Sequence, residues 1–249
     1  ELARANKGEP VNPELNRVLN QALEISKQTK GAFDPTIRPL VDLWGFIKKE
    51  GYRLPRPNEL KPVLELVDYR KVALKNERLE FGAKGMSIDS GGFGKGYAVD
   101  RAIEALKKAG IKNAMVKAGG DLRVMGLPPG KTHWTVFIED PQKKGKRVEV
   151  SLQDGALSTS GNYENYFIEN GKRYGHLLDP RTGHPVEGIG SCTVVASTCI
   201  ESDAYATAAC VLGVKRSREL LGKRYGLRFV LLPDQGVPKT VTVGKFPVR

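Results

Sequence analysis

The apolar positions along this chain repeat with a helical period in some stretches and alternate in others. Apolar residues three and four positions apart run through residues 13–29, and a second amphipathic stretch covers residues 97–110. Gly31 lies just beyond the first stretch and Gly110 closes the second, as is common where helices end. The pattern therefore predicts two amphipathic helices.

The C-terminal part of the chain contains two more helical stretches. Residues 198–213 carry a capping-box sequence, from Thr198 to Glu201, which predicts that a helix begins there. A shorter helical stretch follows near residues 215–224. We expect two separate helices in this region.

Short apolar runs bounded by turn residues predict β-strands. The expected strands lie at 71–75, 78–82, 113–118, 122–126, 134–139, 147–152, 192–197, 226–232 and 239–243, and residues 156–168 predict a turn leading into a strand. The strands come mostly in runs, with helices set among them. This order predicts an α+β fold with mixed or antiparallel sheets rather than a doubly wound parallel sheet.

Composition and charge narrow the functional classes. The 249 residues are 40% hydrophobic, which is enough for a packed core, and no stretch approaches the length of a membrane-spanning helix. The net charge of +12 is compatible with nucleic acid, an anionic membrane or a phosphorylated ligand. The basic residues are scattered, and the densest run, at 143–147, comes with no nucleic-acid-binding motif. A solvated basic surface is therefore favoured, and no nucleic-acid partner is expected.

The chain has three cysteines, Cys192, Cys199 and Cys210. An odd number without a C-x-x-C pair argues against a disulfide framework and against a zinc site. Cys192 and Cys210 lie in apolar runs and are expected to be buried thiols.

Residues 88–100, IDSGGFGKGYAVD, place four glycines and Lys95 between an expected strand and an expected helix. The spacing fits neither a P-loop, which needs Ser or Thr after Gly-Lys, nor a G-x-G-x-x-G dinucleotide fingerprint. Glycines still allow a close backbone approach, and a helix N-terminus attracts anions. The residues alone leave a phosphate cradle and a plain tight turn both open.

Asp203 and Thr207 lie four residues apart, so a helix would bring both to one face. Their oxygens suit Mg²⁺, but an Asp near a helix start and a Thr bonded to its own helix are common structural features, and the residues alone favour that interpretation. His176 beside the turn at 179–183 could be a general base or a structural hydrogen-bonding group. The segment 158–161, STSG, could be an anion-binding nest or a turn.

Six ordered motifs change the weight of these alternatives by resemblance. GAFDPTIRPLVDLWGF, DSGGFGKGYAVDRA, VKAGGDLRVMG, LSTSGNYENYF, GHLLDPRTGHPV and ESDAYATAACVLG together resemble the ApbE family of FAD:protein FMN transferases, from about residue 10 onward. The resemblance implies a single ApbE-like (T-fold-like) α+β domain over residues 1–249.

The resemblance also implies an activity. Members of this family need Mg²⁺, cleave FAD, pass its FMN half through a phosphoester bond to a Thr or Ser hydroxyl, and release AMP. The implied partners are FAD and an acceptor flavoprotein, such as a subunit of a redox pump or electron-transfer complex. Some members instead hydrolyse FAD to FMN and AMP, and a flavin-binding protein without catalysis is a further alternative.

Site residues follow from the matching positions. The resemblance implies that His176 activates the accepting hydroxyl. In this chain Ala206 stands where some members have a second metal-binding carboxylate, so only its carbonyl oxygen could serve. The implied flavin contacts are Ala32, Phe33, Asp34, Asp89, Lys95 and Leu178, and the implied metal contacts are Gly92, Asp203, Ala206 and Thr207.

The resemblance bears on the N-terminus and the compartment as well. The family's domain usually begins some tens of residues earlier, with a strand that carries further flavin contacts, so we expect the N-terminal part of the domain to be missing here. Mature members are often periplasmic lipoproteins. No signal sequence is visible in this chain, so a periplasmic or membrane-anchored location is expected from the family alone and a cytoplasmic one stays open.

Overall fold

The computed structural model describes residues 1–47, 51–139, 147–162, 165–232 and 237–248. The chain forms two compact units. Unit 1 comprises Glu1–Gly92 and Glu164–Val186, and unit 2 comprises Phe93–Tyr163 and Glu187–Arg249. Each unit is described by itself below.

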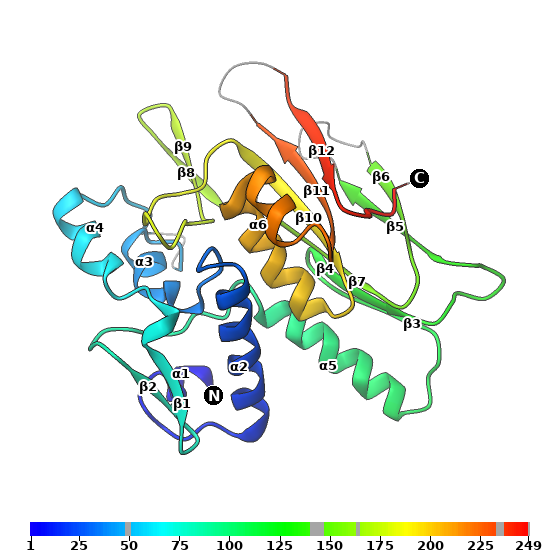
Figure 1. The fold of residues 1–249 in the computed structure, drawn as a ribbon, viewed down its shortest axis with the longest axis horizontal. Coiled ribbons are helices and arrows are strands. Elements are labelled where there is room, and N and C mark those ends of the chain that lie inside the picture. The colour runs from blue at the N-terminus through cyan, green and yellow to red at the C-terminus, as the bar shows by residue number, and fades with distance from the viewer. Residues whose placement is uncertain (48–50, 140–146, 163–164, 233–236, 249) are drawn as a thin grey trace. The chain divides into compact units, whose positions relative to one another are not determined.

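Unit 1 consists of several helices, the longest with 16 residues, and two β-hairpins (Figure 1). Strand β1 pairs with β2, and β8 pairs with β9, both antiparallel. Its elements are α1 (Leu2–Ala5), α2 (Pro13–Gln28), η1 (Pro35–Ile37), α3 (Arg38–Leu43), α4 (Pro57–Leu64), η2 (Tyr69–Lys71), β1 (Val72–Lys75), β2 (Arg78–Phe81), β8 (Tyr166–Glu169) and β9 (Lys172–Gly175). The strands predicted at 71–75 and 78–82 are confirmed, and they form one of these hairpins.

Helix α2 forms where the apolar period predicts it. The side chain of Asn12 accepts a hydrogen bond from Leu15 N at 2.7 Å, and Pro13 occupies the first helical position, where its missing N–H costs nothing. The apolar stripe of the helix is buried, and Gly31, with φ of 77°, turns the chain away from the helix end.

The core of unit 1 is aromatic and fixes the turn at 179–183. Trp44 is fully buried in a cluster that includes Leu60 and Leu178, and its Nε1 donates to Gly183 O at 2.8 Å. A Cβ at Gly183 would lie 2.9 Å from Leu60 Cδ1, and φ of +74° there disfavours other residues. Glycine at this position therefore lets the turn pack onto the core.

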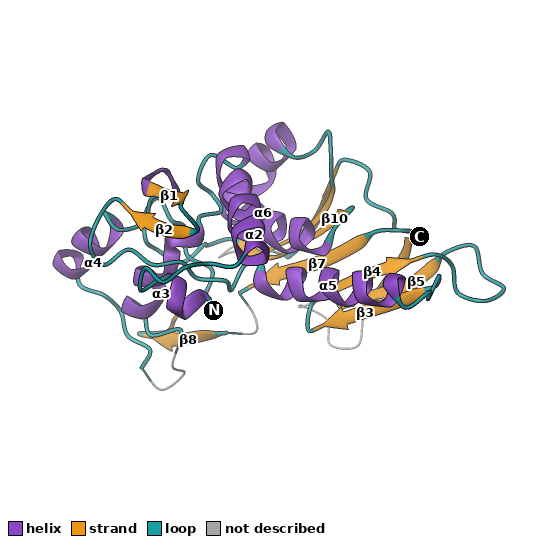
Figure 2. Cartoon of the chain, turned by 90° about the horizontal axis from the view of Figure 1, so that it is seen from below, coloured by secondary structure: helices purple, strands orange, loops and turns teal. Residues whose placement is uncertain are grey.

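Unit 2 is built on one six-stranded antiparallel sheet with the order β12-β11-β10-β7-β4-β3. Helices α5 and α6 pack side by side on this sheet, as Figures 1 and 2 show. Its elements are α5 (Gly94–Lys108), β3 (Ala114–Ala118), β4 (Asp121–Met125), β5 (Trp134–Glu139), β6 (Arg147–Leu152), β7 (Ala156–Gly161), β10 (Ile189–Ala196), α6 (Cys199–Leu220), β11 (Gly226–Leu231) and β12 (Lys239–Val243). The α+β prediction is confirmed.

The sheet of unit 2 is covered on both faces. On one face, β7 directs Ala156, Ser158 and Ser160 toward the helices, where Ser158 Oγ lies 2.7 Å from Ser202 Oγ. On the other face, Leu157 and Leu122 pack with apolar residues of the β5–β6 hairpin. The alternation of β7 therefore places Ala156, Ser158 and Ser160 on the helix-facing side and Leu157 on the side of the β5–β6 hairpin.

The two helices predicted at 198–213 and 215–224 are both present within α6, because its helical backbone is interrupted at Gly213, where φ is 68° and ψ is 176°. Two other local predictions are wrong. The STSG segment, 158–161, is neither a nest nor a turn, because it lies within β7 and pairs with β10. The Thr198 hydroxyl does not cap α6, because it donates to Glu201 Oε2 at 2.9 Å.

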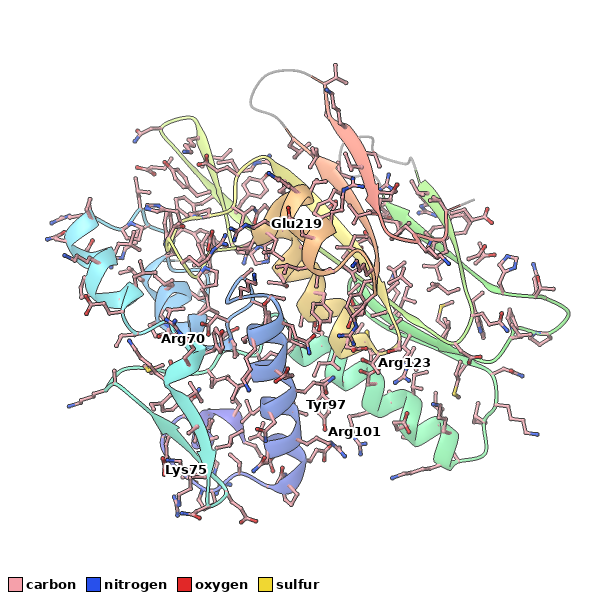
Figure 3. All side chains as sticks on the ribbon, viewed as in Figure 1. Arg70, Lys75, Tyr97, Arg101, Arg123 and Glu219 are labelled. Atoms are coloured by element: carbon pink, nitrogen blue, oxygen red, sulfur yellow. The ribbon has the colours of Figure 1, made fainter. Side chains whose placement is uncertain are left out.

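Asp100 of α5 supplies the missing cap. Its carboxylate accepts from Cys199 N at 2.8 Å and from Ile200 N at 2.9 Å, which are the first free N–H groups of α6. Arg123 of β4, labelled in Figure 3, donates from Nη1 to Asp100 Oδ1 at 2.7 Å. The Asp100 carboxylate thus places a negative charge at the positive end of the α6 dipole, and its hydrogen bonds connect α5, β4 and α6.

We predict that Asp100→Ala lowers the free energy of unfolding by about 2–4 kcal/mol, because it leaves a largely buried Arg123 and two N–H groups without their acceptor. Urea denaturation measures the change. Glu104→Ala is the matched control, because Glu104 is more exposed and lies 3.9 Å from the same guanidinium. The control should lose less than about 1 kcal/mol. Equal losses in both variants would contradict the capping role.

Candidate functional site

Helices α5 and α6 touch at Gly96, the last glycine of the glycine-rich segment. Gly96 N donates to Asp203 Oδ2 at 3.0 Å. A Cβ at Gly96 would lie 2.3 Å from Cys199 O and 2.8 Å from Asp203 Cβ, so only glycine fits without a shift of the backbone. Helix α5 begins at Gly94, three residues earlier than the predicted start at 97, and part of the glycine segment is therefore its first turn.

A buried carboxylate pair lies beside this contact. Asp203 and Asp121 are 3% and 1% exposed, and Lys95 Nζ forms an ion pair with the Asp121 carboxylate. The Lys95 side chain is 56% exposed, so its ammonium group remains partly hydrated. Two buried carboxylates thus share one lysine, which leaves the cluster short of positive charge.

The charge deficit appears in the pKa of Asp203, which is raised to about 7. Burial is the main cause, because it disfavours the charged form, and the negative charge of Asp121 adds to it. Lys95 and the hydrogen bond from Gly96 N act in the opposite direction. A second positive charge near Asp203 would therefore favour its ionised form.

The oxygens near Asp203 fit a hard divalent cation. No donor within the described part of the chain reaches Asp203 Oδ1. Thr207 lies one turn further along α6, and its Oγ1 is 3.1 Å from Ser160 Oγ, while Ala206 between them is fully buried. The described residues contain no group of three or more His, Cys, Asp or Glu side chains that could hold a metal. Mg²⁺ commonly binds through one or two protein oxygens and completes its shell with water and phosphate oxygens.

In unit 1, the segment Ala32–Asp34 is buried after α2. Asp34 Oδ1 accepts from Thr36 N and Oγ1 at 2.8 and 2.6 Å, and Oδ2 accepts from Tyr69 N at 2.9 Å. Burial raises the pKa of Asp34 despite these hydrogen bonds. The carboxylate holds η1 and η2 together, so its oxygens are already used within the protein.

Asp89 orders the start of the glycine-rich segment. Its N–H donates to Pro35 O at 2.8 Å, its Oδ1 accepts from Gly91 N at 2.6 Å, and Arg38 Nη1 lies 3.9 Å from its Oδ2. Gly92 follows in the turn and is the last residue of the first segment of unit 1. Asp89 therefore fixes the backbone of this turn to the segment around η1.

His176 follows directly after β9 and is partly buried. Its backbone N–H donates to Asn165 O at 3.0 Å, and its Nδ1 lies 3.1 Å from the same oxygen. Leu178, two residues further, is 5% exposed and belongs to the aromatic core of unit 1. The backbone of Asn165 therefore holds both the main chain and the ring of His176.

The predicted site residues fall into two groups. Lys95, Asp203, Ala206 and Thr207 belong to unit 2, and Ala32, Phe33, Asp34, Asp89, Gly92, His176 and Leu178 belong to unit 1. Sequence reasoning missed two acidic residues near Asp203. Asp121 forms the ion pair with Lys95, and Asp100 caps the helix that carries Asp203. The only signal for Asp121 was an acidic residue that follows two glycines at the start of a buried strand.

The sequence and the fold are similar to those of known proteins. A model described as the ApbE family matches residues 1–231. The FAD:protein FMN transferase of Haemophilus influenzae is 34% identical, with 95% of this chain and 73% of the relative covered. The ApbE protein of Thermotoga maritima superposes with a TM-score of 0.87 at 33% identity, covering 96% of this chain and 80% of that one. The flavinyl transferase ApbE of Pseudomonas stutzeri gives 0.85 at 30% identity, covering 97% and 78%.

The raised pKa of Asp203 predicts a pH dependence of stability. Because its folded pKa of about 7 lies above the ordinary 3.8, the protonated form stabilises the fold at low pH, and this contribution is lost as the pH rises from about 4 to about 7. Asp203→Asn removes the titration. In EDTA, the variant should gain about 1–3 kcal/mol relative to the parent between pH 4.5 and pH 8, measured by urea denaturation. A pH-independent difference between the two proteins would contradict the shifted pKa.

Proposed function

Because this chain belongs to the ApbE family, we propose that it is a Mg²⁺-dependent FAD:protein FMN transferase. It transfers the FMN half of FAD to a Thr or Ser hydroxyl of an acceptor flavoprotein and releases AMP. Curated relatives that carry this name align over 91–95% of the chain. The structural observation that carries the proposal is the buried Asp203–Asp121 pair beside the start of α5, where the described residues supply Lys95 as the ion-pair partner of Asp121 and no donor to Asp203 Oδ1.

Asp203 is the group best suited to hold the metal. With Thr207 and the main-chain oxygen of Ala206, it would offer hard oxygens on one side of α6. A bound Mg²⁺ would offset the charge of the carboxylate pair and neutralise negative charge on phosphate oxygens. The assignment of Gly92 as a main-chain metal contact rests on the family resemblance.

Lys95 is the group in unit 2 suited to an anionic substrate. Its ammonium is paired with Asp121 but partly exposed, so it can form a charge-assisted hydrogen bond to a diphosphate oxygen. In unit 1, the carboxylate of Asp34 holds η1 and η2 through Thr36 and Tyr69, and its implied flavin contact rests on the resemblance. Flavin contacts from Ala32, Phe33, Asp89 and Leu178 rest on the resemblance.

His176 is the proposed base. As the acceptor hydroxyl oxygen bonds to the FMN-side phosphorus, the phosphoanhydride P–O bond breaks and AMP leaves. The hydroxyl proton moves to the imidazole of His176. Water in place of the protein hydroxyl would give FMN and AMP, which is the pyrophosphatase alternative.

The direct test incubates the protein with FAD, Mg²⁺ and a peptide that bears an acceptor threonine. Mass spectrometry should show one FMN added to the peptide, and AMP should form in equal amount and only without EDTA. If FMN and AMP form but no adduct appears, either on the peptide or on a full-length flavoprotein acceptor, the result would favour the pyrophosphatase. FAD binding without any cleavage would favour a flavin carrier and overturn the proposal.

We predict that three substitutions separate the roles. Asp203→Ala should abolish Mg²⁺-dependent AMP release, and His176→Ala should slow transfer by about 10²–10⁴-fold while FAD still binds. Lys95→Ala should weaken FAD binding by about 10- to 100-fold, because it removes a charged donor to phosphate. Calorimetric titration of FAD measures the affinities.

The matched control for Lys95→Ala is Lys108→Ala, which removes an exposed lysine at the far end of the same helix. Both variants lower the net charge by one unit. If they lost the same FAD affinity, Lys95 would act only through the net positive charge of the protein and not through a direct contact. Loss of FAD binding in His176→Ala would point to a binding role for the histidine.

A further inference from the structure

A hydrogen-bonded chain within unit 1 connects Tyr52 to His176. The Tyr52 hydroxyl donates to Asn165 Oδ1 at 2.7 Å. The main-chain oxygen of Asn165 lies 3.1 Å from His176 Nδ1 and 3.0 Å from His176 N. Asn165 is therefore held through its side chain and holds the histidine through its backbone.

This geometry fixes the tautomer of His176. A carbonyl oxygen accepts but cannot donate, so the proton of the hydrogen bond to Asn165 O must be on His176 Nδ1. In the neutral ring the lone pair is then on Nε2. A base can accept a proton only at the nitrogen that carries the lone pair, so this tautomer determines which ring atom reacts.

Aromatic packing fixes the position of Tyr52. Its ring stacks on Phe167, with centroids 5.5 Å apart and an interplanar angle of 14°, and lies 5.6 Å from the Phe46 ring. Phe46 also meets the imidazole of His176 in an edge-on arrangement, with centroids 6.5 Å apart. One cluster of aromatic rings therefore fixes the positions of both the Tyr52 hydroxyl and the His176 imidazole.

We propose that Tyr52, acting through Asn165, is a positioning residue that keeps His176 in the Nδ1–H tautomer with Nε2 as the proton acceptor. The inference rests on the proposed function, in which His176 is the base. Tyr52 contacts neither the substrate nor the reacting atoms in this role. It restricts the Asn165 carbonyl, and the carbonyl selects the tautomer.

Tyr52→Phe is the sharpest variant, because it keeps the stacked ring and deletes only the hydroxyl. The matched control is Tyr174→Phe. The Tyr174 ring stacks on the same Phe167 at 5.2 Å, and its hydroxyl has no hydrogen-bond partner among the described residues. Tyr52→Phe should lower kcat for FMN transfer by about 3- to 10-fold with unchanged FAD affinity, and the control should stay within about twofold.

Asn165→Ala tests the middle of the chain. It removes the side chain that Tyr52 holds but keeps the carbonyl, so it should lower kcat as much as Tyr52→Phe does. The double variant should then fall no further, because both changes break the same connection. Multiplicative losses would show that the two residues act independently and would overturn the proposal.

The decisive readout is the ¹⁵N NMR spectrum of the imidazoles, recorded without substrate at a pH where they are neutral. The chain has only three histidines, and His176→Gln identifies the signal of His176. The parent and Tyr174→Phe should show the Nδ1–H tautomer, and Tyr52→Phe should show a substantial Nε2–H population. An Nε2–H ring in the parent, or an unchanged tautomer in Tyr52→Phe, would overturn the inference. If the parent lacked transfer activity, the proposed function would fail, and this spectrum would still decide the role of Tyr52.

Discussion

The Asp100 carboxylate is the constraint on which the geometry of unit 2 depends. It reaches from α5 to the first N–H groups of α6, and Arg123 holds it from β4. Gly96, one turn earlier on α5, then allows the two helices to touch and donates to Asp203. Helix α6 is thereby fixed at its start, and Asp203 in its second turn is carried to a defined, buried place.

Burial at that place gives Asp203 its chemical character. A carboxylate that is removed from water, faces a second buried carboxylate and has one lysine nearby is poorly compensated. A structural ion-pair network would be expected to balance its charges. An incompletely balanced cluster is instead what a site for a divalent cation and an anionic substrate requires.

The sequence predicted the elements well and the contacts between them poorly. Helix α2 and the β1–β2 hairpin follow from local periodicity and turn residues, which act over a few positions. The cap of α6 could not be predicted, because its acceptor lies about 100 residues earlier, on another helix. For the glycine segment the residues left a cradle and a turn both open, and they did not predict the contact of Gly96 with α6. Asp121 gave almost no local signal. The proposed metal contacts on α6 came from resemblance, since the spacing of Asp203 and Thr207 alone is ordinary.

The central claim is that Asp203 holds a divalent cation that binds the diphosphate of FAD. Replacing Mg²⁺ with Mn²⁺ and recording ³¹P electron–nuclear double resonance on the complex with FAD tests it most directly. The account predicts ³¹P hyperfine coupling in the parent protein and its loss in Asp203→Ala under the same conditions. Bound Mn²⁺ without ³¹P coupling in the parent, or full coupling in Asp203→Ala, would contradict it.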